Sequence, residues 1–189
     1  TTTEKVDDTV GTTSKTNIHF YVPTGAGGHV TAGVMARQML REMKGTELHL
    51  HVATNSNDIF HNILSTGNSH SSSSASSLST LTPASPVIST ISPSMDIQIP
   101  YNLERLLWMS AMFSTSDESM MVERCIESAR LMREFKQTEK IMLGDLIRNR
   151  VAKRCGIRGS SSHDDESTKE IIRQVYMSDE KYVLDPHTA

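Results

Sequence analysis

The feature that most constrains the fold is a glycine-rich turn between a strand pattern and a helix pattern. Residues 17–22 are rich in β-branched and aromatic side chains, which predicts a strand that stops at Pro23. The turn that follows reads Thr-Gly-Ala-Gly-Gly-His over residues 24–29. Apolar residues then recur at helical spacing, so we expect a helix over residues 28–43, with Gly45 as its C-cap glycine.

The segments after this helix extend the same pattern. Residues 48–53 are expected to form the next strand, and residues 58–64 a short helix. Strand, turn, helix and strand together form a βαβ unit, which predicts an α/β fold with a parallel sheet and flanking helices. Further along, we expect helices at 103–113, 121–135, 141–151 and 164–177, strands or extended segments at 95–100 and 182–184, and a loop at 155–162.

Composition shifts divide the chain into four parts. Residues 1–16 are polar without periodicity and are predicted to be a disordered leader, and residues 17–67 form the βαβ unit. Residues 68–86 are so rich in serine that they bury little apolar area, which predicts a disordered surface insertion. Residues 87–189 are expected to be the remainder of the same domain. The chain does not begin with Met and stops within a recognisable motif, so we interpret it as a fragment of a longer protein.

Charge and hydropathy exclude several classes of protein. The formal net charge of the 189 residues is −3, which argues against a polybasic nucleic-acid binder. No apolar run approaches the roughly 20 residues of a membrane helix, and no secretory signal pattern is present. The two cysteines, Cys125 and Cys155, are too few for a disulfide scaffold. We therefore expect a cytoplasmic protein without nucleic-acid or membrane partners.

The glycine-rich turn predicts a phosphate site. Glycines let the backbone approach an anion closely, and the free N–H groups of the following helix point toward it. A Rossmann fingerprint needs a third glycine where Val30 stands, and the Gly-Lys-Ser/Thr of a Walker loop is absent. A phosphate monoester, from a cofactor or a substrate, therefore fits better than a dinucleotide. A tight turn without a ligand is the alternative.

Four blocks of the sequence occur in the order found in one enzyme family. They are residues 22–33 (VPTGAGGHVTAG), 53–59 (ATNSNDI), 92–108 (SPSMDIQIPYNLERLLW) and 182–189 (YVLDPHTA). Together they resemble threonine synthases and threonine synthase-like proteins, with the third block as the most specific. The resemblance spans residues 17–189 and is interrupted by the serine-rich insertion.

This resemblance implies a pyridoxal-phosphate enzyme of fold type II, a carbon–oxygen lyase of threonine and amino-acid biosynthesis. The family converts a phosphorylated amino acid, O-phosphohomoserine, and water into threonine and phosphate, and some relatives eliminate phosphate to give 2-oxobutyrate and ammonia. The expected oligomeric state is a monomer or a homodimer. By position, the implied contacts to the cofactor phosphate are Gly25, Ala26, Gly27, Gly28 and His29, and Thr188 is the implied contact to the pyridine nitrogen.

Two departures from the family pattern affect these implied roles. Ala26 and Gly27 stand where the family commonly has Asn-Phe, and His29 replaces an acidic or amide residue. The family's Schiff-base lysine lies upstream of the loop, and neither Lys5 nor Lys15 sits in the family's lysine motif. No catalytic residue is therefore assigned, and the fragment by itself is expected to be inactive. A non-catalytic relative and a phosphate-monoester-binding module remain as alternatives.

Two further polar groups are candidate ligands. His49 and His51 share one face of their strand, but no cysteine or carboxylate converges on them nearby, so we expect structural histidines and no metal site. Asn55, Asn57 and Asp58 follow the same strand at the edge where α/β proteins bind ligands. A polar cap on the next helix is an equally good interpretation of these three.

Overall fold

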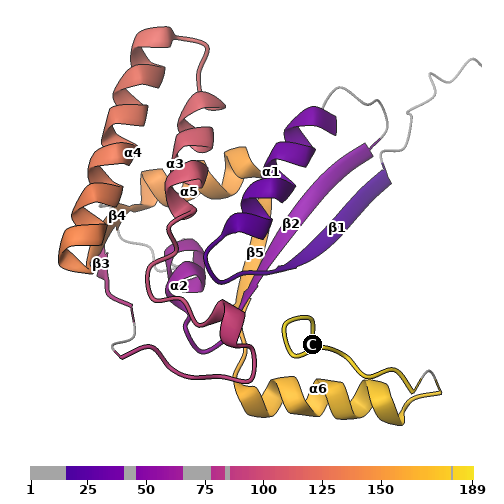
Figure 1. Ribbon diagram of the computed structural model, residues 1–189. Coiled ribbons are helices and arrows are strands. Elements are labelled where there is room, and N and C mark those ends of the chain that lie inside the picture. Colours follow the sequence, from indigo (N-terminus) through magenta and orange to yellow (C-terminus); the bar gives the residue numbers. More distant parts are fainter. Residues whose placement is uncertain (1–15, 41–45, 66–77, 84–85, 180) are drawn as a thin grey trace, which may run out of the picture.

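The computed structural model describes residues 16–40, 46–65, 78–83, 86–179 and 181–189. Figure 1 shows the order of the elements along the chain. In chain order they are β1 (Thr16–Pro23), α1 (Gly28–Leu40), β2 (Thr46–Thr54), α2 (Ile59–Ser65), β3 (Leu78–Leu81), the 3-10 turn η1 (Pro93–Met95), α3 (Leu103–Met112), α4 (Glu118–Thr138), β4 (Ile141–Gly144), α5 (Asp145–Cys155), β5 (Ile157–Ser162) and α6 (Asp165–Met177).

The main sheet has three parallel strands in the order β1-β2-β5. Strand β1 pairs with β2 without interruption, from Thr16 opposite Thr46 to Pro23 opposite Ala53. Strand β2 in turn pairs with β5, with a shift of register after Leu50. The predicted α/β class, the parallel sheet and the first βαβ unit are confirmed.

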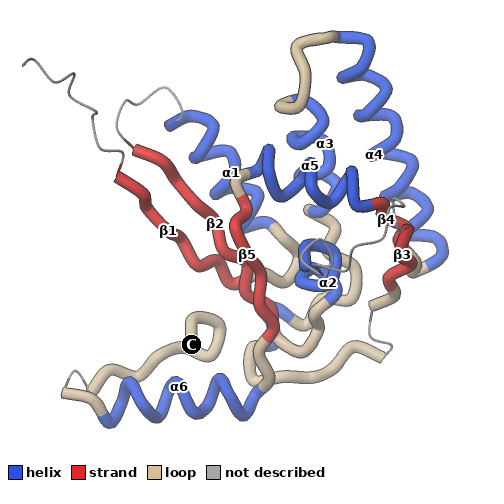
Figure 2. The backbone as a smooth tube through the Cα atoms, turned by 180° about the vertical axis from the view of Figure 1, so that it is seen from behind, coloured by secondary structure: helices blue, strands red, loops and turns tan. Residues whose placement is uncertain are grey.

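The helices cover one face of this sheet (Figure 2). On β2 the buried Leu48, Leu50 and Val52 point toward the helices, and they alternate with His49 and His51 on the opposite face. The core continues into apolar side chains of the helices: Val30 and Val34 of α1, Ile59, Phe60 and Ile63 of α2, Leu103, Leu106 and Leu107 of α3, Met132 and Phe135 of α4, and Val151 of α5. Parallel sheets usually carry helices on both faces. Here the alternation of apolar and polar residues matches a sheet covered on one side.

The prediction from sequence is wrong for strand β5. Residues 155–162 were expected to be a loop because glycine and serine have low strand propensity. They instead form β5, in which Ser160, Ser161 and Ser162 pair with β2. Hydrogen bonding to a neighbouring strand supplies what local propensity does not, so tertiary structure overrides the local signal.

Residues 141–151 were expected to be wholly helical, and this is also wrong. The apolar run at Ile141–Gly144 forms β4, and the helix α5 begins only at Asp145. Strand β4 pairs antiparallel with β3, which lies inside the predicted insertion of residues 68–86. That segment is therefore structured at Leu78–Leu81, whereas residues 66–77 and 84–85 lie outside the described part, as do the predicted leader up to residue 15 and Gly45.

The strand predicted at residues 182–184, and the strand alternative for residues 95–100, are absent among the described residues. The segment 95–100 holds the end of η1 and a series of bends, and residues 182–184 have no strand partner. The prediction for residues 95–100 rested on the alternation of apolar and polar residues alone. The prediction for residues 182–184 rested on three consecutive apolar or aromatic residues. Neither signal forms a strand without a neighbouring edge to pair with.

None of the described helices combines the length and the apolar character that crossing a bilayer requires.

Candidate functional site

The glycine-rich turn joins β1 to α1 through a backbone bend that only glycine accepts easily. Gly27 has a φ of +83°, in the left-handed region. Its carbonyl oxygen accepts hydrogen bonds from the Thr31 amide at 3.1 Å and from the Thr31 hydroxyl at 2.7 Å. Gly27 therefore acts as the N-terminal boundary of α1, which begins at Gly28.

Distant segments hold this turn in place. A Cβ atom on Gly25 would lie 2.7 Å from the Cα atom of Met95, and one on Gly27 would lie 2.8 Å from the Phe60 ring. The Asn102 amide donates to the Ala26 carbonyl oxygen at 3.0 Å. Three parts of the chain thus pack against the turn, which fixes its backbone before any ligand arrives.

The open side of the turn fits an anion. Gly28 and His29 are exposed, and they open a helix whose first N–H groups have no acceptor within the helix. A Cβ on Gly28 would meet only the Asn102 Nδ2 atom, at 3.4 Å. Packing therefore leaves open space beside Gly28.

Asn102 belongs to this site although sequence reasoning did not single it out. Its side chain is buried at 5% exposure, its Oδ1 accepts from Arg105, and its Nδ2 lies beside Gly28. The amide group can donate to an anion bound at the turn. The available signal was its place in the most specific of the four sequence blocks, directly before the helix α3.

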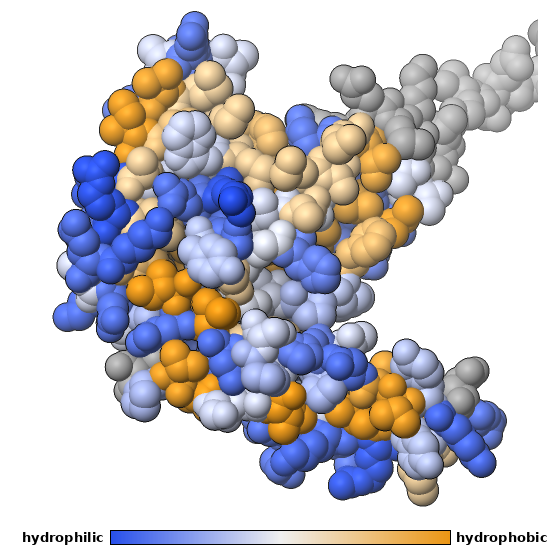
Figure 3. Space-filling view, in the orientation of Figure 1, coloured by the Kyte–Doolittle hydropathy of each residue, from blue (hydrophilic) through white to orange (hydrophobic). Residues whose placement is uncertain are grey.

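A groove of about 810 Å³ begins beside the turn at Thr31 and Asn102. It runs between α1 and α3, where Figure 3 shows apolar side chains gathered on the surface. Its apolar lining includes Met35, Met39, Trp108 and Met112. The turn thus lies at the polar end of a largely apolar hollow.

Thr188 lies at the same edge of the sheet but not in the same cavity. It is exposed and lines a small cavity of about 70 Å³ together with Pro23 at the end of β1 and residues 53–55 at the end of β2. Residues 25–29 do not line that cavity. A tight turn carries Thr188 there, with its amide donating to the Asp185 carbonyl at 2.9 Å, instead of the strand expected at 182–184. Its role at the pyridine ring stays a prediction.

His187 holds this C-terminal turn to the body of the domain. Its Nδ1–H donates to the Asp185 carboxylate at 2.7 Å, and its Nε2 accepts from the Ser94 amide at 3.4 Å. Hydrogen bonds from the His187 backbone and side chain hold the pKa of Asp185 below its ordinary value.

The asparagines after β2 form a structural network. The Asp96 carboxylate accepts from Asn55 Nδ2 at 2.7 Å, from Asn57 Nδ2 at 3.2 Å and from the Thr90 hydroxyl at 2.6 Å. Asn57 also bonds both backbone groups of Ile88. This network fastens residues 88–96, and hence Met95, onto the end of β2. The third candidate of that group, Asp58, accepts from the side-chain amide of Asn62 at 2.9 Å, and its backbone carbonyl oxygen accepts from the Asn62 amide at 2.9 Å, as at the start of a helix.

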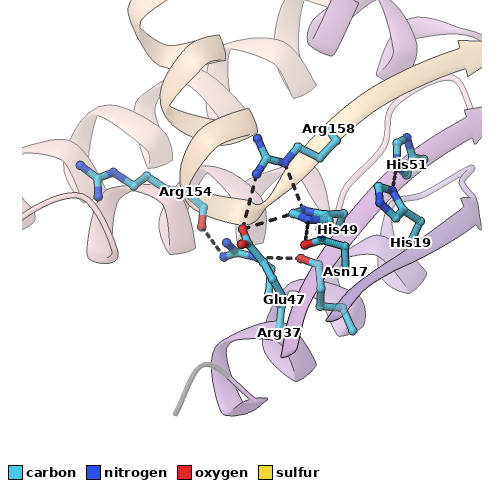
Figure 4. Close-up of polar contacts among 9 residues, drawn as sticks. Asn17, His19, Arg37, Glu47, His49, His51, Arg154 and Arg158 are labelled. Carbon is cyan, nitrogen blue, oxygen red and sulfur yellow. Dashed lines mark hydrogen bonds and ion pairs between the residues drawn. The ribbon is translucent and has the colours of Figure 1, made fainter. Parts of the chain in front are cut away.

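The open face of the sheet carries a row of aromatic rings (Figure 4). His49 is buried, and its Nδ1 accepts from Arg158 Nε at 3.1 Å while its Nε2 donates to Asn17 Oδ1 at 3.2 Å. Burial, followed by the charge of Arg158, lowers the pKa of His49 and keeps the ring neutral. His51 also has a lowered pKa, through burial first and then through His19, whose Nδ1 lies 2.9 Å from His51 Nε2.

Comparison with known proteins finds homologues along most of the chain. No protein-family model matches the chain. Mouse threonine synthase-like 2 is 31% identical over 172 residues, which cover 91% of this chain and 29% of the relative. Threonine synthase of Schizosaccharomyces pombe is 32% identical over 173 residues, covering 92% and 32%. The crystal structure of yeast threonine synthase superposes with a TM-score of 0.70 at 29% identity, covering 91% of this chain and 30% of that one.

The chain is a homologue of the threonine synthases. It spans about 30% of the length of the relatives it matches, so the homology concerns one segment of that enzyme. The alignments take in most of the chain, in agreement with the resemblance carried by the four sequence blocks. Among the described residues, no lysine lies on β1, the glycine-rich turn or α1.

Proposed function

We propose that this chain is the cofactor-phosphate segment of a threonine synthase-like pyridoxal-phosphate enzyme. The substrate would be O-phosphohomoserine, converted with water into threonine and phosphate, or by elimination into 2-oxobutyrate, ammonia and phosphate. The names and homology of the relatives support the family. The observation that carries the proposal is Gly28, an exposed glycine at a helix N-terminus with open space where a side chain would stand.

The chain's own residues would bind and orient the cofactor. The backbone N–H groups of Gly28 and His29 would donate to phosphate oxygens, and the positive end of the α1 dipole would favour the dianion. The Asn102 Nδ2 group would add one side-chain donor in place of the Asn-Phe that this turn lacks. When bound, pyridoxal phosphate supplies an electron sink for a substrate carbanion.

Thr188 would contribute a hydroxyl group to the pyridine nitrogen. A hydroxyl can donate a hydrogen bond to an unprotonated ring nitrogen, so it does not force the ring to become cationic. Its exposed position at the carboxyl ends of β1 and β2, the usual ligand edge of α/β sheets, supports this role.

A second candidate is a relative that binds the cofactor or another phosphate monoester without catalysis. The feature in its favour is that neither Lys5 nor Lys15, the lysines that precede the turn, sits in the family's lysine motif. Both candidates share the phosphate site, so a binding measurement tests what they have in common.

That measurement is the affinity of the 189-residue chain for pyridoxal phosphate, with and without inorganic phosphate as competitor. Gly28→Ala adds a methyl group that packing accepts but a phosphate does not, so we expect at least about tenfold weaker binding. Gly159→Ala is the matched control, because its added Cβ would make only an ordinary contact of 3.4 Å with His51. Equal affinity in both variants, with intact folds, would move the phosphate site elsewhere.

The reaction is tested by product analysis. The chain is incubated with pyridoxal phosphate and O-phosphohomoserine, and the organic product is identified as threonine or 2-oxobutyrate. We expect no turnover by this chain alone, because no residue in it is assigned as the Schiff-base lysine. Turnover would show that a lysine within these 189 residues serves the cofactor.

A further inference from the structure

Strand β1 is an outer strand of the sheet, and its free edge is unprotected. The strand order is β1-β2-β5, so among the described residues only β2 pairs with β1, as Figures 1 and 2 show from two sides. Proteins usually protect such an edge with charged residues, proline or a bulge. Strand β1 has no acidic residue, lysine or arginine and no register shift, and its proline is its last residue. Ile18, Phe20 and Tyr21 are exposed. The edge is therefore open to another strand.

The backbone groups on this free edge can be assigned from the pairing on the other side of β1. Directly after β1, the Thr24 amide donates to the Ala53 carbonyl oxygen at 2.7 Å. In a parallel pair, the N–H and C=O groups of one residue point to the same side, and that side alternates from residue to residue. Even-numbered residues of β1 therefore bond β2. The odd-numbered Asn17, His19 and Tyr21 direct their N–H and C=O groups outward.

We propose that β1 pairs antiparallel with β1 of a second copy of this chain, about a two-fold axis at His19. In this register His19 lies opposite His19 of the second copy, and Asn17 lies opposite Tyr21. Directly opposite residues that point at each other exchange both of their hydrogen bonds. The two copies would form one continuous sheet in the order β5-β2-β1-β1-β2-β5. The inference is independent of the function proposed for the glycine-rich turn, because that turn begins after the last residue of β1.

Hydrogen bonding selects this register over its neighbours. A two-fold axis at Phe20 would place Asn17 opposite Pro23, which has no N–H group to donate. An odd shift of one strand would set the apolar side chains of one copy against the polar face of the other. Only with the axis at His19 do all the outward N–H groups of the described strand find an acceptor in the second copy.

The side chains of β1 suit a partner with the same sequence. On the face toward the helices, Ile18 of each copy would lie opposite Phe20 of the other, and aromatic and β-branched residues form favourable cross-strand pairs. Two-fold pairing brings each residue close to its own counterpart, so an acidic or basic residue on β1 would meet a like charge. The absence of such residues from β1 therefore favours a second copy as the partner.

The test is the oligomeric state of the full 189-residue chain, measured by sedimentation equilibrium. We expect a concentration-dependent dimer. His19→Glu and His19→Lys each place two like charges at the axis, so each variant should dimerise at least about tenfold more weakly. An equimolar mixture of these two variants should restore the dimer, because opposite charges then meet. His163→Glu is the matched control, since this exposed histidine follows the end of β5, and it should dimerise like the parent.

Amide hydrogen exchange tests the register, and circular dichroism checks the fold of each variant. At higher protein concentration, exchange should slow at Asn17, His19 and Tyr21, and change less at the residues between them, which bond β2 in either state. If a His19 variant fails to fold, Tyr21→Pro replaces it, because proline removes an outward N–H group and leaves the bonds to β2 in place. A parent chain that stays monomeric would overturn the proposal. So would a dimer that the folded His19 variants leave unchanged, or a mixture that does not associate.

Discussion

The glycine-rich turn and the C-terminal turn were both expected to contact one cofactor, and the structure holds them in different ways. The glycine-rich turn is packed on three sides, by Met95, Phe60 and Asn102. The C-terminal turn is exposed and is attached through hydrogen bonds of His187. A rigid turn can organise an anion site in advance, whereas the C-terminal turn can change position at little cost. The first region is therefore held more rigidly than the second.

Gly27→Val should give the largest effect, and it acts on the rigid turn. The side chain would collide with Phe60 and would have to adopt a φ of +83°, which a β-branched residue tolerates poorly. We expect a loss of about 3 kcal/mol or more in the free energy of unfolding, measured by urea denaturation. Gly28→Ala is the matched control and should lose less than about 1 kcal/mol. If the two variants lose similar amounts of unfolding free energy, packing against Phe60 does not distinguish Gly27 from Gly28.

Asp96→Ala should weaken both regions, because Asp96 anchors the segment that touches each of them. Met95 packs on Gly25, and the Ser94 amide bonds His187. Removal of the carboxylate takes away one acceptor of the Asn55 and Asn57 side-chain amides and the acceptor of the Thr90 backbone amide, so we expect to lose about 2 kcal/mol.

Asp96→Asn retains one acceptor oxygen and serves as the control for Asp96→Ala, with a smaller expected loss. Urea denaturation gives the global value, and amide hydrogen exchange reports each turn separately. If amide exchange becomes faster in only one of the two turns, Asp96 does not stabilise both of them.

Thr188→Val tests the adjustable region. The side chain is exposed, so we expect a change in unfolding free energy below about 0.5 kcal/mol. If the hydroxyl contacts the cofactor ring, the absorbance of bound pyridoxal phosphate should shift, and Thr188→Ser should restore it. An unchanged spectrum would leave Thr188 as a surface residue of the turn.

The smallest effect is expected at low pH, which should change the C-terminal turn before it changes the glycine-rich turn. His187 holds the pKa of Asp185 below its ordinary value of 3.8. The contribution of this contact to the free energy of unfolding is therefore complete above pH 3.8. It is lost as the pH falls below 3.8 toward the lowered pKa of the folded state. We expect the amide resonances of residues 185–189 to shift in this range before those of residues 25–28. Simultaneous change would indicate global unfolding instead.

The sequence predicted the parts of the fold in which local signals and tertiary packing agree. The turn with Gly25, Gly27 and Gly28 was recognisable because glycine spacing and helix periodicity adjoin, and the strand and helix around it are confirmed. Strand β5 was missed because its stability comes from pairing with β2 and not from its own serine-rich residues. Asn102 was missed for a related reason, since only the folded chain brings its side chain to Gly28.

The pairing of His19 with His51 could not be predicted from spacing along one strand. The i, i+2 pattern placed His49 and His51 on one face, but the register of β1 against β2 puts His19 opposite His49 and diagonally beside His51, to which it hydrogen-bonds, while Arg158 engages His49. Such cross-strand neighbours depend on register, which a single sequence specifies only through the strands as a whole.

The place of β5 in the sheet sets the order in which the chain can fold. The hydrogen bond from Thr54 to Ser161 joins residues that are 107 positions apart, whereas β1 and β2 are linked by a single helix. The βαβ unit can therefore form while the chain is still being synthesised, but β2 keeps an unpaired edge until α5 and β5 leave the ribosome. During that interval the edge of β2 is open to pairing with other chains.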